Sequence, residues 1–293
     1  MASLKEIRTR ITSVESTQKI TSAMKLVSAA KLRRSQTAIV ALRYYSNKLN
    51  AILQDIFACI PLCSDYPWFD QRETENVALI VITSNRGLCG AFNTNIIKEV
   101  HRVVQDKYAK QYQERKIKLF CFGKKAVEQL QKNYEILYSN ELLLETPNFE
   151  EVSKIASNLI HNFCDKKFDK VEIVYNHFVN PATQKITIDY FLPVMKTEGL
   201  YSKNAVNEDF LFGPSQKEFM NEFIPKLLII QLYKILLDSI AAEHGARMTA
   251  MAKATDNAIE ILKELKLKYN NARQAAITNE LNEIVSGAEA LKS

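Results

Sequence analysis

The N-terminal part of the chain is patterned as one long helix. Residues 3–57 contain neither glycine nor proline, and their apolar residues recur at helical spacing. The predicted stripe runs with one slip through Leu4, Ile7, Ile11, Val14, Ile20, Met24 and Val27. This pattern predicts a helix of about 55 residues, roughly 80 Å long, which ends before Pro61. Such a length is typical of a coiled coil or a helical repeat.

The C-terminal part repeats this behaviour with a stricter period. Ser215 and Glu218 have the spacing of a capping box, and Pro225 is expected to kink or restart the helix that follows. Seam positions then recur at alternating intervals of four and three residues, at Leu237, Ala241, His244, Met248, Met251, Thr255, Ala258, Leu262, Leu265, Tyr269, Ala272 and Ala276. A 3.5-residue period kept for this long predicts a left-handed coiled coil.

Between the two helical parts, the period changes to that of alternating strands and helices. Strands are predicted at residues 77–83, 117–122, 170–179 and 184–191, and helices at 92–110, 124–132 and 149–166. This order indicates a small α/β domain with a largely parallel sheet, because parallel strands need crossover helices. The last two strands are close in sequence and are expected to form an antiparallel edge.

Each long helix needs a partner for its apolar stripe, and the simplest partner is the other long helix. The predicted seam is rich in small residues: Ala23, Ser28, Ala29, Ala30, Ala241, Ala258, Ala272 and Ala276. The expected fold is therefore α/β plus a long antiparallel coiled coil. Its predicted divisions are an N-terminal helix at 1–60, a linker at 61–76, an α/β domain at 77–208 and a C-terminal helix at 209–293.

Charge is concentrated in the first helix. Residues 1–57 carry ten Lys or Arg and three acidic residues, whereas the whole chain has a net charge of +6. A basic segment favours an acidic partner, which is a nucleic acid, an anionic membrane surface or an acidic protein loop. The opening residues lack an apolar signal core, and no apolar stretch approaches the roughly 20 residues that span a bilayer, so a soluble protein is predicted. Five scattered cysteines predict reduced thiols and no metal site.

The sequence shows no recognisable catalytic arrangement. Gly87 and Gly90 follow a predicted strand, but neither GxxxxGK[ST] nor GxGxxG is present, so a tight turn is favoured over a nucleotide site. Arg86 in that turn is expected to meet an acidic partner. Glu243-His244 opens an HExxH-like string, but position 248 is Met. Two alternatives stay open: a coiled-coil scaffold with a nucleotide-binding α/β head, and a nucleic-acid-binding basic helix.

Several long motifs resemble one known family. They are LKEIRTRI (4–11), TQKITSAMKLV (17–27), SNRGLCGAFN (84–93), EHGARM (243–248), YNNARQAAITNE (269–280) and EIVSGA (283–288). In this order they resemble the gamma subunits of F-type, proton-translocating ATP synthases along the whole chain.

The resemblance implies a rotor shaft with no catalytic site and no cofactor, whose α/β domain is Rossmann-like. It implies as partners three alpha and three beta subunits, epsilon and the ring of c subunits, and a peripheral place on the cytoplasmic face of a bacterial plasma membrane. Implied contacts with beta are Arg273, Gln274 and Thr278 on the upper shaft and Lys19, Met24 and Lys25 on the lower shaft. Phe210 and Phe212 are implied in the foot contact with the c ring and epsilon. Gly245 interrupts the second helix at about 1 kcal/mol relative to Ala and is interpreted as a point of local compliance.

Overall fold

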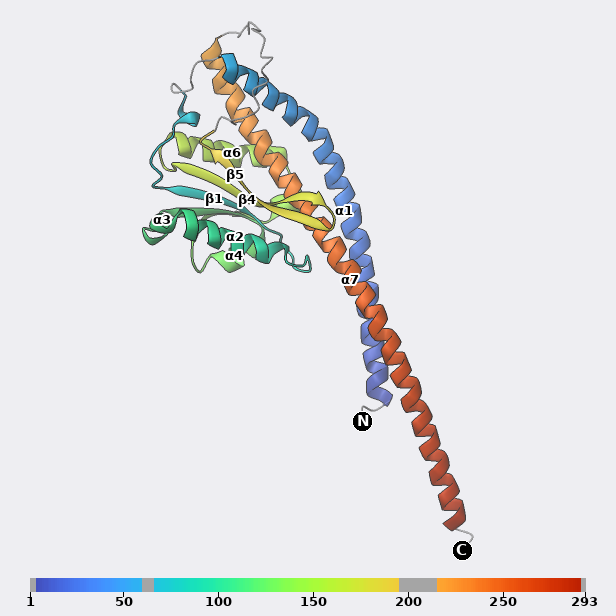
Figure 1. The fold of residues 1–293 in the computed structure, drawn as a ribbon. Helices are drawn as coiled ribbons and strands as arrows, with labels where there is room; N and C mark the ends of the chain where they lie inside the picture. The colour runs from blue at the N-terminus through green and yellow to red at the C-terminus, as the bar shows by residue number, and fades with distance from the viewer. Residues whose placement is uncertain (1–3, 60–65, 195–214, 291–293) are drawn as a thin grey trace. The chain divides into compact units, whose positions relative to one another are not determined.

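The computed structural model describes residues 4–59, 66–194 and 215–290, which form two compact units (Figure 1). Residues 29–247 make the first, an α/β unit, and the segments up to residue 28 and from residue 248 make the second, a helical unit. Two long helices contribute to both units, α1 (Leu4–Cys59) and α7 (Gln216–Ala290). The predicted divisions at residues 60, 76 and 208 stay predictions.

A five-stranded sheet lies at the centre of the α/β unit. Its order is β3-β2-β1-β4-β5, with parallel pairing except for the antiparallel edge pair of β4 and β5. The strands are β1 (Val77–Ile82), β2 (Ile117–Phe122), β3 (Glu135–Asn140), β4 (Lys170–Asn180) and β5 (Thr183–Leu192). The predicted α/β class and antiparallel edge are confirmed. The sequence missed β3, an edge strand with alternating exposure rather than a continuous apolar run.

Helices cover both faces of this sheet. On one face lies α6 (Phe149–Cys164), and on the other lie α2 (Phe92–Lys107) and α4 (Lys124–Leu130), with α3 (Ala109–Gln113) beyond them (Figure 1). All six residues of β1 are inaccessible to solvent, as expected for a parallel strand covered on both sides. Two short helices complete the unit, η2 (Pro67–Phe69) and α5 (Leu142–Glu145).

The first part of α7 is a core helix of the α/β unit. Met220, Ile224, Leu228 and Leu232 are almost fully buried and join the core on the α6 side of the sheet. Ser215 Oγ accepts a hydrogen bond from the backbone N–H of Glu218 at 3.2 Å, which confirms the Ser215 half of the predicted capping box. The expected restart at Pro225 is wrong, because the helix continues through it. Ile224 and Leu228, on either side of Pro225, are buried in the core, and such packing can offset the hydrogen bond that a proline removes.

The helical unit pairs the beginning of α1 with the later part of α7. Thr255 Oγ1 lies 2.8 Å from Thr21 Oγ1, and Lys266 Nζ lies 3.5 Å from Glu15 Oε1, so the two helices run antiparallel, as predicted. From Met248 to Ala276, every predicted seam position of α7 is buried or half-buried. The seam assigned to α7 by its period is therefore confirmed in this unit.

The predicted slip in α1 is wrong at Ile20 and Val27, whereas Met24 is half-buried. Ile20 is 59% exposed and Val27 58% exposed, and Ala23 and Ala30 are exposed as well. Buried or half-buried residues recur at intervals of three and four at Leu4, Ile7, Ile11, Val14, Gln18 and Thr21, and the series resumes at Ser28 after one exposed position, Lys25. Polar residues hold the register where apolar residues were expected, because the coiled-coil geometry fixes which side of α1 faces α7.

Candidate functional site

The turn at residues 84–90 joins β1 to α2 and is held by side chains on both sides of it. Ser84 Oγ donates to the Arg86 carbonyl at 2.6 Å, and Asn93 Oδ1 accepts from the Ser84 N–H at 2.9 Å. Leu88 and Gly90 both have positive φ, at 64° and 62°. A leucine in this region is strained, and such strain persists only where surrounding contacts impose it.

A buried arginine of α7 completes the hold on this turn. Arg247 Nη1 donates to Glu243 Oε1 at 2.7 Å, while its Nη2 donates to the carbonyls of Arg86 at 3.2 Å and Gly87 at 3.4 Å. The side chains of Arg247 and Glu243 are each 10% exposed. We call Glu243, Arg247 and the two carbonyls the Arg247 network.

Burial shapes the protonation of this network. Desolvation raises the pKa of Glu243, against the opposing effect of Arg247. Desolvation also lowers the pKa of His244 to about 4, and the charges of Arg247 and Lys31 act in the same direction. His244 is therefore neutral near pH 7, and Glu243 and Arg247 form a paired contact rather than an acid–base pair open to a substrate.

The turn displays one cation and one apolar side chain to solvent. The side chain of Arg86 is 82% exposed and lies 3.6 Å from Glu145 Oε1, and Leu88 is 63% exposed. Gly87 has open space where a side chain would begin, whereas Gly90 needs its positive φ. The turn is thus held by hydrogen bonds while two of its side chains are exposed to solvent, and Gly90 is required by the backbone conformation.

The outer face of α1 in the helical unit combines apolar and basic side chains. We define it as Lys19, Ile20, Leu26 and Val27, all exposed, with Leu26 at 69%. Lys19 and Leu26, like Ile20 and Val27, are seven residues apart and so share a side of the helix. Of the predicted lower-shaft residues, Lys25 is also exposed and Met24 is half-buried.

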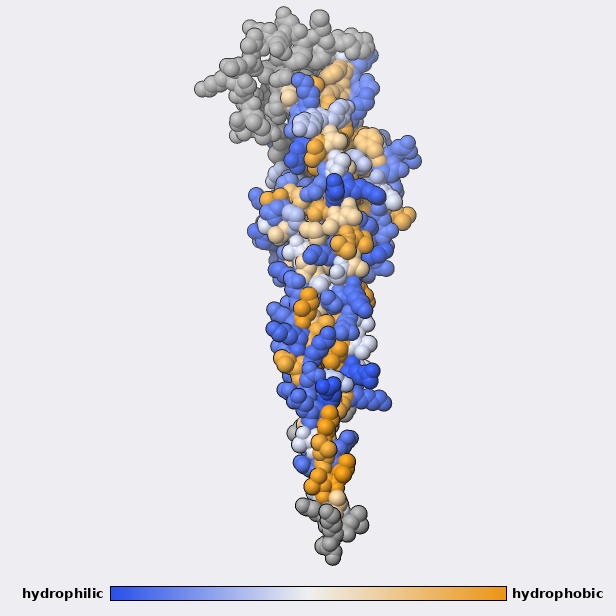
Figure 2. All heavy atoms as spheres, turned by 90° about the vertical axis from the view of Figure 1, so that its right-hand side faces the viewer, coloured by the Kyte–Doolittle hydropathy of each residue, from blue (hydrophilic) through white to orange (hydrophobic). Residues whose placement is uncertain are grey.

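The end of α7 carries a second exposed apolar surface. Ile277, Leu281, Ile284 and Val285 are 49–67% exposed, and we call them the C-terminal stripe. Apolar side chains gather at this end of the chain in Figure 2. The predicted upper-shaft residues Arg273, Gln274 and Thr278 are exposed beside it. Phe210 and Phe212 lie outside the described residues.

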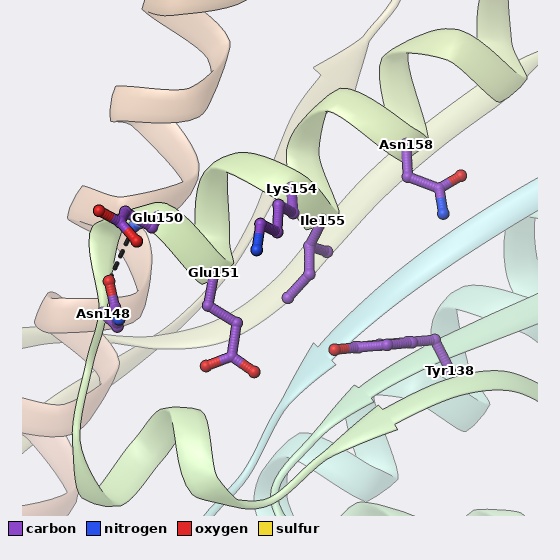
Figure 3. A pocket seen from close by; sticks show the side chains of 7 residues that line it. All are labelled: Tyr138, Asn148, Glu150, Glu151, Lys154, Ile155 and Asn158. Atoms are coloured by element: carbon purple, nitrogen blue, oxygen red, sulfur yellow. Dashed lines mark hydrogen bonds between the residues drawn. The ribbon is translucent and has the colours of Figure 1, made fainter.

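A cavity of about 460 Å³ lies between β3 and α6 (Figure 3). Tyr138 lies on the β3 side, and α6 contributes Glu150, Glu151 and Lys154. Asn148 caps the helix by accepting from the Glu150 N–H at 2.9 Å. Two carboxylates at this helix N-terminus repel a phosphate, so the cavity does not favour the nucleotide-binding alternative.

Sequence reasoning missed the Arg247 network and both exposed apolar surfaces. Ile20 and Val27 were assigned to the seam because they are apolar, and the C-terminal stripe lies beyond the last seam position. The available signal was register: these residues depart from the 3.5-residue period that the rest of the helices keep. Within the described residues, no helix combines the length and apolar character needed to cross a membrane.

Comparisons with known proteins agree along the whole chain. The sequence model of the family described as ATP synthase matches residues 3–291. The chain is 48% identical to the ATP synthase gamma chain of Christiangramia forsetii and 50% identical to that of Flavobacterium johnsoniae, each over 99% of both chains.

Solved structures show the same fold. A chain from the central stalk and c ring of Tetrahymena thermophila mitochondrial ATP synthase matches with a TM-score of 0.60 at 24% identity, covering 80% of this chain and 99% of its own. A chain from the rotor of Euglena gracilis mitochondrial ATP synthase matches with a TM-score of 0.65 at 20% identity, covering 94% and 98%. By its family match and its bacterial relatives, the chain belongs to the ATP synthase gamma chain family.

Proposed function

We propose that this chain is the central rotor shaft of a bacterial F-type ATP synthase. In this role it couples proton-driven rotation of the c ring to ATP synthesis or hydrolysis at the beta subunits, and it carries no catalytic site itself. The observation that carries the proposal is the inverted patterning of α1, whose seam includes Gln18, Thr21 and Ser28 while its outer face exposes Ile20 and Val27. Exposed apolar patches of this kind mark interaction surfaces.

The chemistry of these surfaces suits a shaft that exchanges partners as it turns. Burying one Ile or Val side chain against a partner contributes about 1.5–3 kcal/mol, and an exposed ion pair about 0–1 kcal/mol. Contacts of this size hold a shaft without locking it at one angle. Torque transfer is then a coupling free energy between the angle of the shaft and nucleotide affinity at beta.

The proposed contacts follow these surfaces. Lys19, Met24, Lys25 and the outer face of α1 meet acidic loops of the beta subunits, as does Arg86 in the turn. Arg273, Gln274 and Thr278 meet beta at the upper shaft, and the segment with Phe210 and Phe212 meets the c ring and epsilon. The assembly places the chain peripherally, at the cytoplasmic face of the plasma membrane.

Co-purification tests the assembly directly. Tagged chain expressed with its own alpha and beta subunits is expected to recover them at about one copy per three of each, and a stable complex without them contradicts the proposal. Calorimetric titration of the isolated chain with ATP and NAD tests the scaffold alternative, because saturable micromolar binding contradicts the shaft assignment.

A surface variant tests the contact itself. Ile20→Glu with Val27→Glu is expected to keep the helical content and melting temperature, because both side chains are exposed, yet to weaken assembly at least tenfold. Thr9→Glu with Thr12→Glu, two exposed positions on the same helix, is the matched control. Equal assembly of both variants would remove the outer face of α1 from the interface.

A further inference from the structure

The turn at residues 84–90 displays its contact side chains only while its backbone is held. Leu88 has a strained φ of 64°, and its side chain is 63% exposed. Burial of that side chain therefore does not offset the strain. The holding contacts converge on one carbonyl, that of Arg86, which accepts from Ser84 Oγ at 2.6 Å and from Arg247 Nη2 at 3.2 Å.

Arg247 differs from Ser84, the other donor to this carbonyl, in its distance along the chain. Ser84 is two residues from Arg86, whereas Arg247 is 161 residues away from it in sequence. Its guanidinium is nearly buried, its Nη1 is fixed by Glu243, and its Nη2 is aimed at two successive carbonyls. The planar fork of an arginine can bond a carboxylate and carbonyls at the same time, which the single ammonium of a lysine cannot match.

From this geometry we infer that Arg247 is a positioning residue, which fixes the turn at residues 84–90 so that Arg86 and Leu88 meet a partner in one set orientation. Glu243 orients Arg247, and α7 thereby sets the contact surface at the end of β1. The inference rests on the proposed function for the identity of the partner, an acidic and partly apolar surface of a beta subunit. The positioning itself is a property of this chain alone.

Limited proteolysis reads the hold on the turn directly. Trypsin cleaves after Arg86, and the carbonyl that it must polarise is the one that Ser84 and Arg247 hold. The informative pair is Glu243→Gln, which keeps the Arg247 donors, and Glu243→Gln with Arg247→Met, which removes them without leaving a buried unpaired carboxylate. The Arg102–Val103 bond, inside α2, is the internal reference for unfolding of the α/β unit.

The expected result is a cleavage rate at Arg86–Gly87 at least tenfold higher in the double variant than in Glu243→Gln, with an unchanged rate at Arg102–Val103. Glu222→Gln with Lys226→Gln, an exposed pair of the same spacing on α7, is the matched control and is expected to change neither rate. For Arg247→Lys, the cleavage rate at Arg86–Gly87 is expected to lie between those of Glu243→Gln and the double variant. Unchanged cleavage at Arg86–Gly87, or an equal rise at both bonds, overturns the inference.

A second measurement, in the assembled complex, tests whether the contact of Arg86 with its partner depends on Arg247. Arg86→Ala is expected to lower ATP-driven proton pumping at least threefold in the Glu243→Gln background. In the background of Glu243→Gln with Arg247→Met, it is expected to cause no further loss of pumping. An equal effect of Arg86→Ala in both backgrounds overturns the inference. If Arg86→Ala changes nothing even in the wild-type chain, the proposed contact with beta fails, and proteolysis still decides the positioning role.

Discussion

At the residue scale, Gly245 is a point of close packing. A Cβ at this position would lie 3.2 Å from both Phe178 Cε2 and Pro181 Cα, at the tip of the hairpin formed by β4 and β5. Nearby, Asp238 Oδ2 accepts from the Phe178 N–H at 3.2 Å and contacts His177. The structure thus gives Gly245 a steric reason to be there, which differs from the local compliance that the sequence suggested.

Gly245→Val is therefore expected to destabilise the chain by about 1–3 kcal/mol, because it overpacks a contact that includes backbone atoms. Chemical denaturation followed by circular dichroism measures the effect. Gly287→Val on the same helix is the matched control, since Gly287 has open space around it, and it is expected to leave the midpoint unchanged. Equal denaturation midpoints for the two variants would show that the hairpin of β4 and β5 shifts to accommodate the added side chain at little cost.

His244 predicts a pH dependence of stability. Its pKa is about 4 in the folded chain against an ordinary 6.5, because burial and the charges of Arg247 and Lys31 disfavour the imidazolium. The unfolded chain therefore binds more protons between these values, and the stability present above about pH 6.5 is lost as the pH falls towards 4. The full loss is on the order of 3 kcal/mol at 1.36 kcal/mol per pKa unit.

The difference between wild type and His244→Gln isolates this effect. Burial raises the pKa values of Glu243 and Asp238, which act on stability in the opposite direction, but both residues are common to the two proteins. Denaturation midpoints at pH 5 and pH 7.5 are expected to show a larger loss for wild type than for the variant. Parallel profiles would contradict a neutral, buried His244.

At the element scale, α1 and α7 differ in how much their sequences reveal. The seam of α7 was predictable because small and apolar residues keep a strict period through to Ala276. In residues 18–28 of α1 the apolar residues Ile20 and Val27 face outward, while Gln18, Thr21 and Ser28 take seam positions. Hydrophobicity alone cannot distinguish a surface kept for another chain from a seam within this one, whereas register can.

The sheet and its surroundings show the same division. Continuous or alternating apolar patterns predicted four strands, but β3 has the mixed pattern of an edge and was missed. The hydrogen bonds from Arg247 to the carbonyls of Arg86 and Gly87 join residues that are 160 or more positions apart in the sequence. No local sequence pattern predicts such tertiary contacts.

The polar seam of the helical unit predicts a stabilising substitution. Thr255 Oγ1 lies near both Thr21 Oγ1 and the Met251 carbonyl, and Thr21 Oγ1 donates to the Gln18 carbonyl. Replacing both threonines with valine removes both hydroxyls together and adds buried methyl groups, so a gain of about 1 kcal/mol in coiled-coil stability is expected. Thermal unfolding followed at 222 nm measures it.

Thr9→Val with Thr12→Val is the control for that experiment, because both hydroxyls are exposed and donate only within α1. This pair is expected to change little, since valine and threonine have similar helix propensities. A lower melting temperature for Thr21→Val with Thr255→Val would mean that the hydroxyl contact, rather than apolar burial, stabilises the seam.

At the scale of the whole molecule, the end of α7 separates folding from assembly. Residues 277–288 are all exposed, and they include the four apolar side chains of the C-terminal stripe. A surface that contributes little to the fold of the isolated chain can be removed with a change of less than about 0.5 kcal/mol in stability. If the chain is a rotor shaft, the same surface is buried by its partners.

Truncation after Ala276 is therefore expected to leave the melting of the remaining chain unchanged but to lower ATP synthesis by the assembled complex several-fold. The full-length variant Ile277→Gln, Leu281→Gln, Ile284→Gln and Val285→Gln keeps the helix and removes only the apolar side chains. Because burial of the C-terminal stripe is the proposed contribution, this variant should lose as much synthesis as the truncated chain. Wild-type synthesis by the glutamine variant would show that the length of α7, and not its apolar stripe, engages the beta subunits.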